Sequence, residues 1–163
     1  THIIMKKVIF FLAIMLACVA CNNKQNSNAF ETFADQFGKT ANFAYANIGD
    51  RQVLLVSHEV FGNDENADKQ AVAATVFALD ADGKIVCLGS IRSQGTLYPV
   101  SIYDNKLMVA GHQFVYIYDI RGEEDPELTL SKHEEGDYDS PQLKEMFKTF
   151  EQGTPVKFKP SLK

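Results

Sequence analysis

The sequence predicts a mainly β protein of the α+β class, in which an antiparallel β-meander is flanked by an N-terminal and a C-terminal helix. Short β-prone stretches alternate with turn signals between residues 41 and 130. Before this region, Phe30, Phe33 and Phe37 recur at helical spacing. After it, Ser140-Pro141 opens a second amphipathic stretch, with a capping residue followed by proline at the first helical position.

Both helices have sequence signals for their ends. Asn28 and Glu31 have the spacing of a capping box, and Gly38 follows the three phenylalanines as a stop. The second helix is expected to end at Gly153. Its predicted inner face consists of Leu143, Met146, Phe147 and Phe150.

The expected strands are joined mostly by tight turns, which predicts a meander. Asp82-Gly83 and Asp104-Asn105 provide two of these turns. Polar, acidic loops are expected at 61–69 and 132–139. The predicted strands are residues 41–46, 52–60, 71–79, 84–91, 96–103, 106–110, 114–120, 128–130 and a short terminal strand at 156–158.

The stretch Phe114 to Ile120 is apolar on both of its alternating faces. Phe114, Tyr116 and Tyr118 share one face with Ile120, and the residues between them form the other. A strand of this kind is expected in the centre of a sheet that is covered on both sides. We therefore predict a structural role for this strand rather than a ligand site.

The first residues have the order of an export signal. Met5-Lys6-Lys7 forms a short basic region, and residues 8–20 are apolar and uncharged. This apolar run is shorter than the ~20 residues that a membrane-spanning helix needs. Residues 1–4 are expected to lie upstream of the initiating Met5 and to take no part in the fold.

The apolar run ends in Leu16-Ala17-Cys18-Val19-Ala20-Cys21-Asn22. This segment resembles the lipobox of bacterial lipoproteins, in which small residues precede a cysteine that is cleaved and acylated. The resemblance implies a signal peptide over 1–20 and a lipid anchor at Cys21, with Cys18 as the alternative. Residues 21–27 are then a polar tether, and residues 28–163 form a single globular domain.

The same resemblance implies a place in the cell. The acyl chains anchor the protein to a membrane of the cell envelope. In lipoproteins an aspartate after the acylated cysteine favours the inner membrane. Asn22 stands at that position here, which favours the outer membrane, facing the periplasm.

The charge of the chain excludes two classes of partner. The net charge is −5 over the whole chain and −7 from residue 22 onward, with no clustered basic stripe. Binding of nucleic acid requires such clusters, so it is not expected. Electrostatic docking on an anionic lipid surface is not expected either.

Cys87 is the only cysteine of the predicted domain 28–163. It cannot form a disulfide within the domain. We expect a buried small apolar side chain in the strand 84–91 rather than a reactive thiol.

Several short motifs resemble catalytic or zinc sites but lack the geometry or a residue that such a site needs. Ser57-His58-Glu59 has the composition of a hydrolase triad, but successive strand residues point to opposite faces, so the three cannot act together. His58-Glu59 and His133-Glu134 each lack the second histidine of a zinc-protease helix. His58, His112 and His133 are far apart in the sequence, and we predict neither a metal nor a cofactor.

A calcium-loop start occurs at Asp64, Asn66 and Asp68. Lys69 stands where such a loop needs glycine, and Thr75 stands where it needs a bidentate glutamate. A solvated acidic loop is therefore preferred, with these three residues as weak candidates for calcium.

Two segments 39 residues apart, Val76 to Asp80 and Val115 to Asp119, have the same character. With the hairpins between them, residues 70–130 resemble blades of a β-propeller. The chain has room for two blades, whereas a closed propeller needs about four or more. An ordinary aromatic meander is the preferred interpretation.

These observations are compatible with a binding function and with two alternatives. The first is a non-catalytic envelope lipoprotein that binds a protein partner, a glycan or a small ligand. A basic cell-wall hydrolase is one concrete partner, since it would be attracted to an acidic domain. The alternatives are a small envelope hydrolase that uses a carboxylate pair drawn from Glu59, Asp119 and Glu123-Glu124-Asp125, or a partial propeller module.

We predict that Cys21→Ala abolishes acylation, because the residues before Cys21 fit the lipobox best. Metabolic labelling with an alkyne-bearing palmitate measures this, and Cys18→Ala is the control that should keep its label. Full labelling of the Cys21 variant would move the anchor to Cys18 or refute it.

Overall fold

The computed structural model describes residues 26–62 and 68–163. Its secondary structure confirms the predicted mainly β class with flanking helices. The helices are the helical segment 26–34, a 3-10 turn η1 (Asp35–Phe37) and α2 (Pro141–Glu151). The strands are β1 (Asn42–Ile48), β2 (Arg51–Ser57), β3 (Val60–Phe61), β4 (Gln70–Ala71), β5 (Ala73–Leu79), β6 (Ile85–Arg92), β7 (Ser101–Tyr103), β8 (Lys106–Gly111), β9 (Phe114–Arg121), β10 (Glu127–Glu135) and β11 (Thr154–Pro155).

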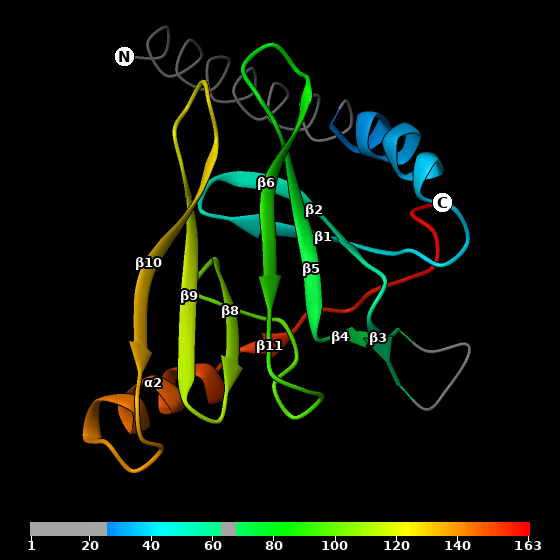
Figure 1. Ribbon diagram of the computed structural model, residues 1–163. Coiled ribbons are helices and arrows are strands. Elements are labelled where there is room, and N and C mark those ends of the chain that lie inside the picture. Colours follow the sequence, from blue (N-terminus) through cyan, green and yellow to red (C-terminus); the bar gives the residue numbers. More distant parts are fainter. Residues whose placement is uncertain (1–25, 63–67) are drawn as a thin grey trace, which may run out of the picture.

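Two antiparallel sheets make up most of the fold (Figure 1). Sheet 1 has four strands in the order β1-β2-β5-β6, and sheet 2 has five in the order β10-β9-β8-β7-β11. The predicted meander is confirmed, since neighbours in each sheet largely follow chain order. The strands of residues 70–130 are divided between the sheets, because the chain leaves sheet 1 after β6.

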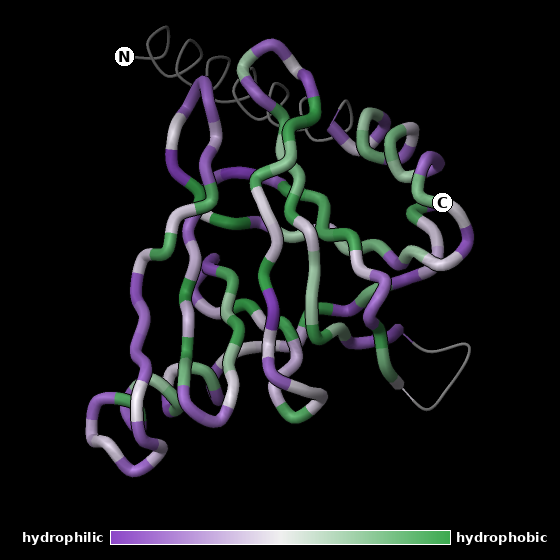
Figure 2. Tube along the Cα trace, viewed as in Figure 1, coloured by the Kyte–Doolittle hydropathy of each residue, from purple (hydrophilic) through white to green (hydrophobic). Residues whose placement is uncertain are grey.

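The inner faces of the two sheets pack against each other. Leu55 of sheet 1 and Leu107 of sheet 2 are both fully buried in this shared core. Strand alternation explains the arrangement, because Val53 and Leu55 point inward while Leu54 and Val56 point to the other side of sheet 1. The hydrophobic stretches of β2, β5 and β8 are visible in Figure 2.

The helical segment 26–34 and η1 cover the outer face of sheet 1. Phe30, Phe33 and Phe37 pack with Phe77 and neighbouring apolar residues, as the helical spacing predicts. The predicted start is wrong, because Asn28 lies inside the helix and its carbonyl accepts a hydrogen bond from Thr32. Packing of the aromatic face therefore sets the helix, and the local capping signal does not.

The outer face of sheet 2 is covered by α2. The predicted cap is confirmed, since Ser140 Oγ accepts the Leu143 amide hydrogen bond at 3.3 Å. Leu143, Met146 and Phe150 are buried against Met108, Ala110, Val115 and Ile117 of the sheet. The molecule thus has four layers, with one helix outside each sheet.

Turn chemistry at the hairpins also follows the prediction. The Asp80 carboxylate accepts hydrogen bonds from the amides of Asp82 and Lys84, both at 2.9 Å. Asp104 and Asn105 have φ values of 48° and 53°, as a tight hairpin turn with two left-handed residues requires.

The structure corrects several of the predicted strands. The predicted strand 52–60 is divided into β2 and β3, and the terminal strand lies at Thr154–Pro155 instead of 156–158. Only Ser101–Tyr103 is a strand within the predicted 96–103. β10 runs for nine residues, although a short strand and a polar loop were predicted there. β9 is an inner strand as expected, but only its α2 side is buried, and Phe114, Tyr116 and Tyr118 remain partly exposed.

Mutation of the shared core should test this layering. Leu55→Ala removes a fully buried side chain between the sheets, so the free energy of unfolding should fall by about 2–5 kcal/mol. The matched change Leu97→Ala, at a side chain that is 78% exposed, should lower it by less than about 0.5 kcal/mol. Urea unfolding followed by circular dichroism measures both, and equal losses would contradict the layering.

Candidate functional site

Strand β6 is held across sheet 2 by contacts at both of its ends. At one end the Ala81 amide donates to the Glu124 carbonyl at 3.0 Å, which joins the β5–β6 turn to the β9–β10 turn. At the other end the Gln94 amide donates to the Ala110 carbonyl at 2.8 Å. These contacts place β6 across sheet 2, where it approaches both β8 and β10.

An arginine strengthens the first of these contacts. The Arg51 guanidinium donates to the Leu79 carbonyl at 2.6 Å and to the carbonyls of Gly122 and Glu123, each at 2.9 Å. One side chain at the start of β2 thereby fixes the end of β5 to the β9–β10 turn. These hydrogen bonds hold the two sheets in a fixed position relative to each other.

Sheet 1 ends at β6, whereas sheet 2 continues beyond β9 to β10. β6 approaches β10 but covers only part of its inner side, since Leu130 and His133 remain exposed. Leu130 is directly paired with Tyr118 and is 41% exposed, and His133 is paired with Tyr116 and is also exposed. We call this surface the open face; its side chains are Phe114, Tyr116, Tyr118, Leu128, Leu130, His133 and Glu135.

The aromatic rings of the open face form a continuous row. The ring centroids of Phe114 and Tyr116 are 4.8 Å apart, and those of Tyr116 and Tyr118 are 6.4 Å apart. The His133 ring lies 6.3 Å from Tyr116. Aromatic side chains with one apolar surface and one polar tip are common at protein interfaces.

A hydrogen bond fixes the middle of this row. The Tyr116 hydroxyl donates to the Glu135 carboxylate at the end of β10. That hydrogen bond, together with desolvation and the nearby negative charge, raises the pKa of Tyr116 to about 12. Tyr116 is therefore a neutral hydrogen-bonded phenol at physiological pH, and its ring is held on the open face.

Acidic side chains surround the open face. Segment 121–139, which contains β10 and its flanking turns, has eight acidic and two basic residues, a net charge of −6. Nearly all of the −7 carried from residue 22 onward is thus concentrated here. In Figure 2 the lower part of β10 is correspondingly hydrophilic.

A second, smaller surface lies between α2 and the loop before β7. It is a groove of about 310 Å³ lined by Leu97, Tyr98, Tyr138 and Phe147, among others. Tyr98 stacks near Phe147 at 5.9 Å and its hydroxyl is 3.2 Å from His112 Nδ1. Tyr138 is 57% exposed at its rim. This groove has no charged pair aimed into it, and its exposed apolar side chains do not continue into an unpaired strand.

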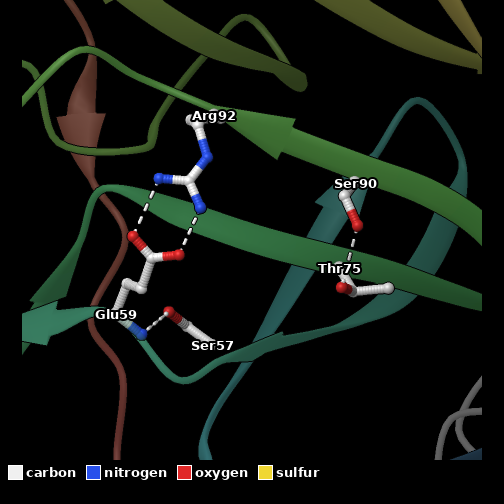
Figure 3. A network of polar contacts seen from close by, with 5 residues as sticks. All are labelled: Ser57, Glu59, Thr75, Ser90 and Arg92. Atoms are coloured by element: carbon white, nitrogen blue, oxygen red, sulfur yellow. Dashed lines mark hydrogen bonds and ion pairs between the residues drawn. The ribbon is translucent and has the colours of Figure 1, made fainter.

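Ser57, His58 and Glu59 are engaged with separate partners, and only Ser57 lies on a strand, because β2 ends there and the predicted strand 52–60 is interrupted. Ser57 is buried, and its Oγ accepts the Glu59 amide hydrogen bond at 3.1 Å. His58 Nδ1 contacts Thr40 Oγ1 at 3.3 Å instead of either neighbour. In Figure 3 the Glu59 carboxylate points away from Ser57 toward Arg92.

Two candidate carboxylates of a hydrolase, Glu59 and Asp119, are engaged in separate ion pairs. Arg92 binds Glu59 through both terminal guanidinium nitrogens, and this hydrogen bonding lowers the pKa of Glu59. Lys106 Nζ lies 2.8 Å from Asp119, and its hydrogen bond lowers the pKa of Asp119. A general acid needs a raised carboxyl pKa, which is the opposite shift. In the Glu123-Glu124-Asp125 run, the backbone carbonyls of Glu123 and Glu124 hold the turn contacts.

Of the weak calcium candidates, Asp64 and Asn66 lie outside the described residues. Asp68 lies 3.9 Å from Lys159 Nζ. Each of His58, His112 and His133 contacts a different partner. Within residues 26–62 and 68–163, no group of three His, Cys, Asp or Glu side chains could hold a metal ion.

Of the three cysteines, Cys18 and Cys21 lie outside the described residues. Cys87 is described, and the prediction that it is buried is wrong, because it is exposed on β6. The prediction placed Cys87 as a buried apolar side chain of a strand, whereas β6 forms the edge of sheet 1.

The open face was not predicted from the sequence. The aromatic row was expected in the core, because alternation shows which side chains share a face of a strand but not how far the facing sheet extends. The signal available was the polar, acidic stretch after Leu130, which continues the strand that pairs with Tyr116 and Phe114.

No protein-family model, curated protein or solved structure matches the chain. In the part of the chain that the structure describes, no helix has both the length and the apolar character needed to cross a membrane.

Proposed function

We propose that this protein is a non-catalytic binding module of the bacterial cell envelope that uses the open face to contact another envelope protein. A lipid anchor at Cys21 holds it at the membrane, on the periplasmic side of the outer membrane. The observation that carries the proposal is the uncovered apolar and aromatic surface of β9 and β10, next to a strand of exposed backbone.

The shape of the open face favours a macromolecular partner over a small ligand. Small-molecule sites are concave and enclose most of the ligand. The open face is one side of a sheet, so an occupant would lie along it rather than inside it. Exposed aromatic patches on monomeric proteins usually mark sites of interaction.

The ion pairs of the candidate carboxylates favour a binding function over a hydrolytic one. Glu59 and Asp119 each have a basic partner and a lowered pKa. Glu59 lies in the connection between β2 and β3, Asp119 lies on β9, and each is engaged with its own basic partner, so neither serves as the acid of a glycosidase pair. The module therefore acts by occupying a surface of its partner.

Photo-crosslinking in living cells tests this function. A photoreactive amino acid at Leu130 should yield a discrete adduct of higher mass, because this side chain contacts the partner. The same amino acid at Thr32, an exposed position on the helical segment 26–34, is the control and should yield none.

A second variant ties the adduct to the open face. Tyr116→Ala in the Leu130 crosslinking protein should reduce the adduct, since the row of rings loses its central member. Absence of an adduct from position 130, or equal adducts from 130 and 32, would contradict the proposed function.

A further inference from the structure

The edges of the two sheets differ in how they are protected against pairing with another strand. β10 carries Lys132, His133 and two glutamates at its exposed end, with a register shift between Leu130 and Lys132. β11 is two residues long and contains Pro155, and β1 is bridged at Phe43 by Lys159. Charges, irregularities, proline and short length are the usual ways to block an edge.

The edge of β6 lacks most of these features. Its residues from Ile85 to Ile91 include no charged residue and no proline. The only irregularity is the shifted pairing that places Gly89 and Cys87 opposite Val76 and Phe77. Among the described strands, β6 pairs only with β5, so one side of its backbone is available for hydrogen bonding.

The position beside β6 coincides with the open face. β6 crosses sheet 2 and approaches β10 without covering the part where Leu130 and His133 are exposed. A strand added to the free edge of β6 would extend sheet 1 over this part of β10, and its inward side chains would cover Tyr118 and Leu130. Four strands in sheet 1 would become five, which matches the five of sheet 2.

We propose that β6 binds an extended segment of the partner protein as an additional strand, whose apolar side chains cover the open face and whose basic residues contact the acidic segment 121–139. This inference rests on the proposed function and identifies its partner chemically. Backbone hydrogen bonds to β6 supply affinity that is independent of sequence, and contacts of alternate side chains supply selectivity.

The distribution of charge determines the chemistry of the segment. Glu123, Glu124 and Asp125 lie in the turn at one end of β10, and Glu134, Glu135 and Asp137 lie at the other end. The residues between them that face inward include Leu128 and Leu130. The complementary segment is apolar at alternate positions in its centre and has lysine or arginine at both ends.

A synthetic peptide tests the inference directly. The probe has the length of β10, nine residues, with a Val-Thr-Val-Thr-Val centre between two pairs of lysines. Its affinity for the full-length protein in detergent micelles is measured by fluorescence anisotropy. Two further peptides carry N-methyl groups on the alternate amides of one edge or of the other.

The expected result is an asymmetric effect of methylation. Only one peptide edge faces β6, so methylation of that edge should weaken binding about tenfold or more, while methylation of the other should change it little. Leu130→Lys should weaken binding of the unmodified peptide by a similar factor, because it places a charge on the open face. The matched control Leu97→Lys, which puts the same charge on a distant exposed side chain, should not.

Salt and sequence controls test the charge argument. Binding should weaken several-fold when sodium chloride is raised from about 0.05 to about 0.5 M, since the contacts are between exposed charges. A peptide with glutamate in place of lysine should bind at least about tenfold more weakly. Equal binding of the acidic peptide would overturn the assignment of a basic segment.

The outcomes separate this inference from the proposed function. Equal effects of methylation on both edges, with the Leu130→Lys loss retained, would refute strand addition and leave the open face as a binding surface. Absence of peptide binding, or binding unaffected by Leu130→Lys, would also refute the inference, whereas the proposed function is decided by the crosslinking at positions 130 and 32.

Discussion

The fold depends on covering four apolar sheet faces with one small chain. Leu55 and Leu107 point between the sheets, while Leu54 and Met108 point outward, so neither sheet can expose its second side. Burying each of these side chains stabilises the fold by roughly 1.5–3 kcal/mol, which requires the two inner faces to pack together and a helix to cover each outer face. β6 is fixed to sheet 2 near both of its ends and covers only part of β10, so Leu130 and the aromatic row beside it remain partly exposed.

Much of the architecture follows from local sequence signals. Ser140-Pro141 sets the start of α2, the Asp104-Asn105 turn joins β7 to β8, and the spacing of Phe30, Phe33 and Phe37 identifies a helix that packs on a sheet. These signals act within a few residues, so they can be interpreted without knowing which strands face each other. Asn28 shows the limit, because the helix passes through this residue where aromatic packing favours more turns.

The candidate site could not be predicted because it depends on how far each sheet extends. Tyr116 and Tyr118 occupy alternate positions of an inner strand, a pattern that is the same for a buried row and for a half-covered one. Cys87 was misplaced for the same reason, since an edge strand and a central strand can have equally apolar sequences. Exposure at both places is set by the number of strands in the opposing sheet, which is a property of the tertiary fold. The open face combines an aromatic row, a free strand edge and most of the negative charge, and the proposals of binding and strand addition draw on all three.

The central claim is that the part of β10 around Leu130 is uncovered when the protein is alone. Hydroxyl-radical footprinting of the purified full-length protein tests it most directly, because the rate of side-chain oxidation reports exposure to water. Leu130 and Tyr116 should be oxidised readily, whereas Leu107 and Leu55 should be protected. Protection of Leu130 to the level of Leu107 would show that the protein covers this face itself, and would contradict the account.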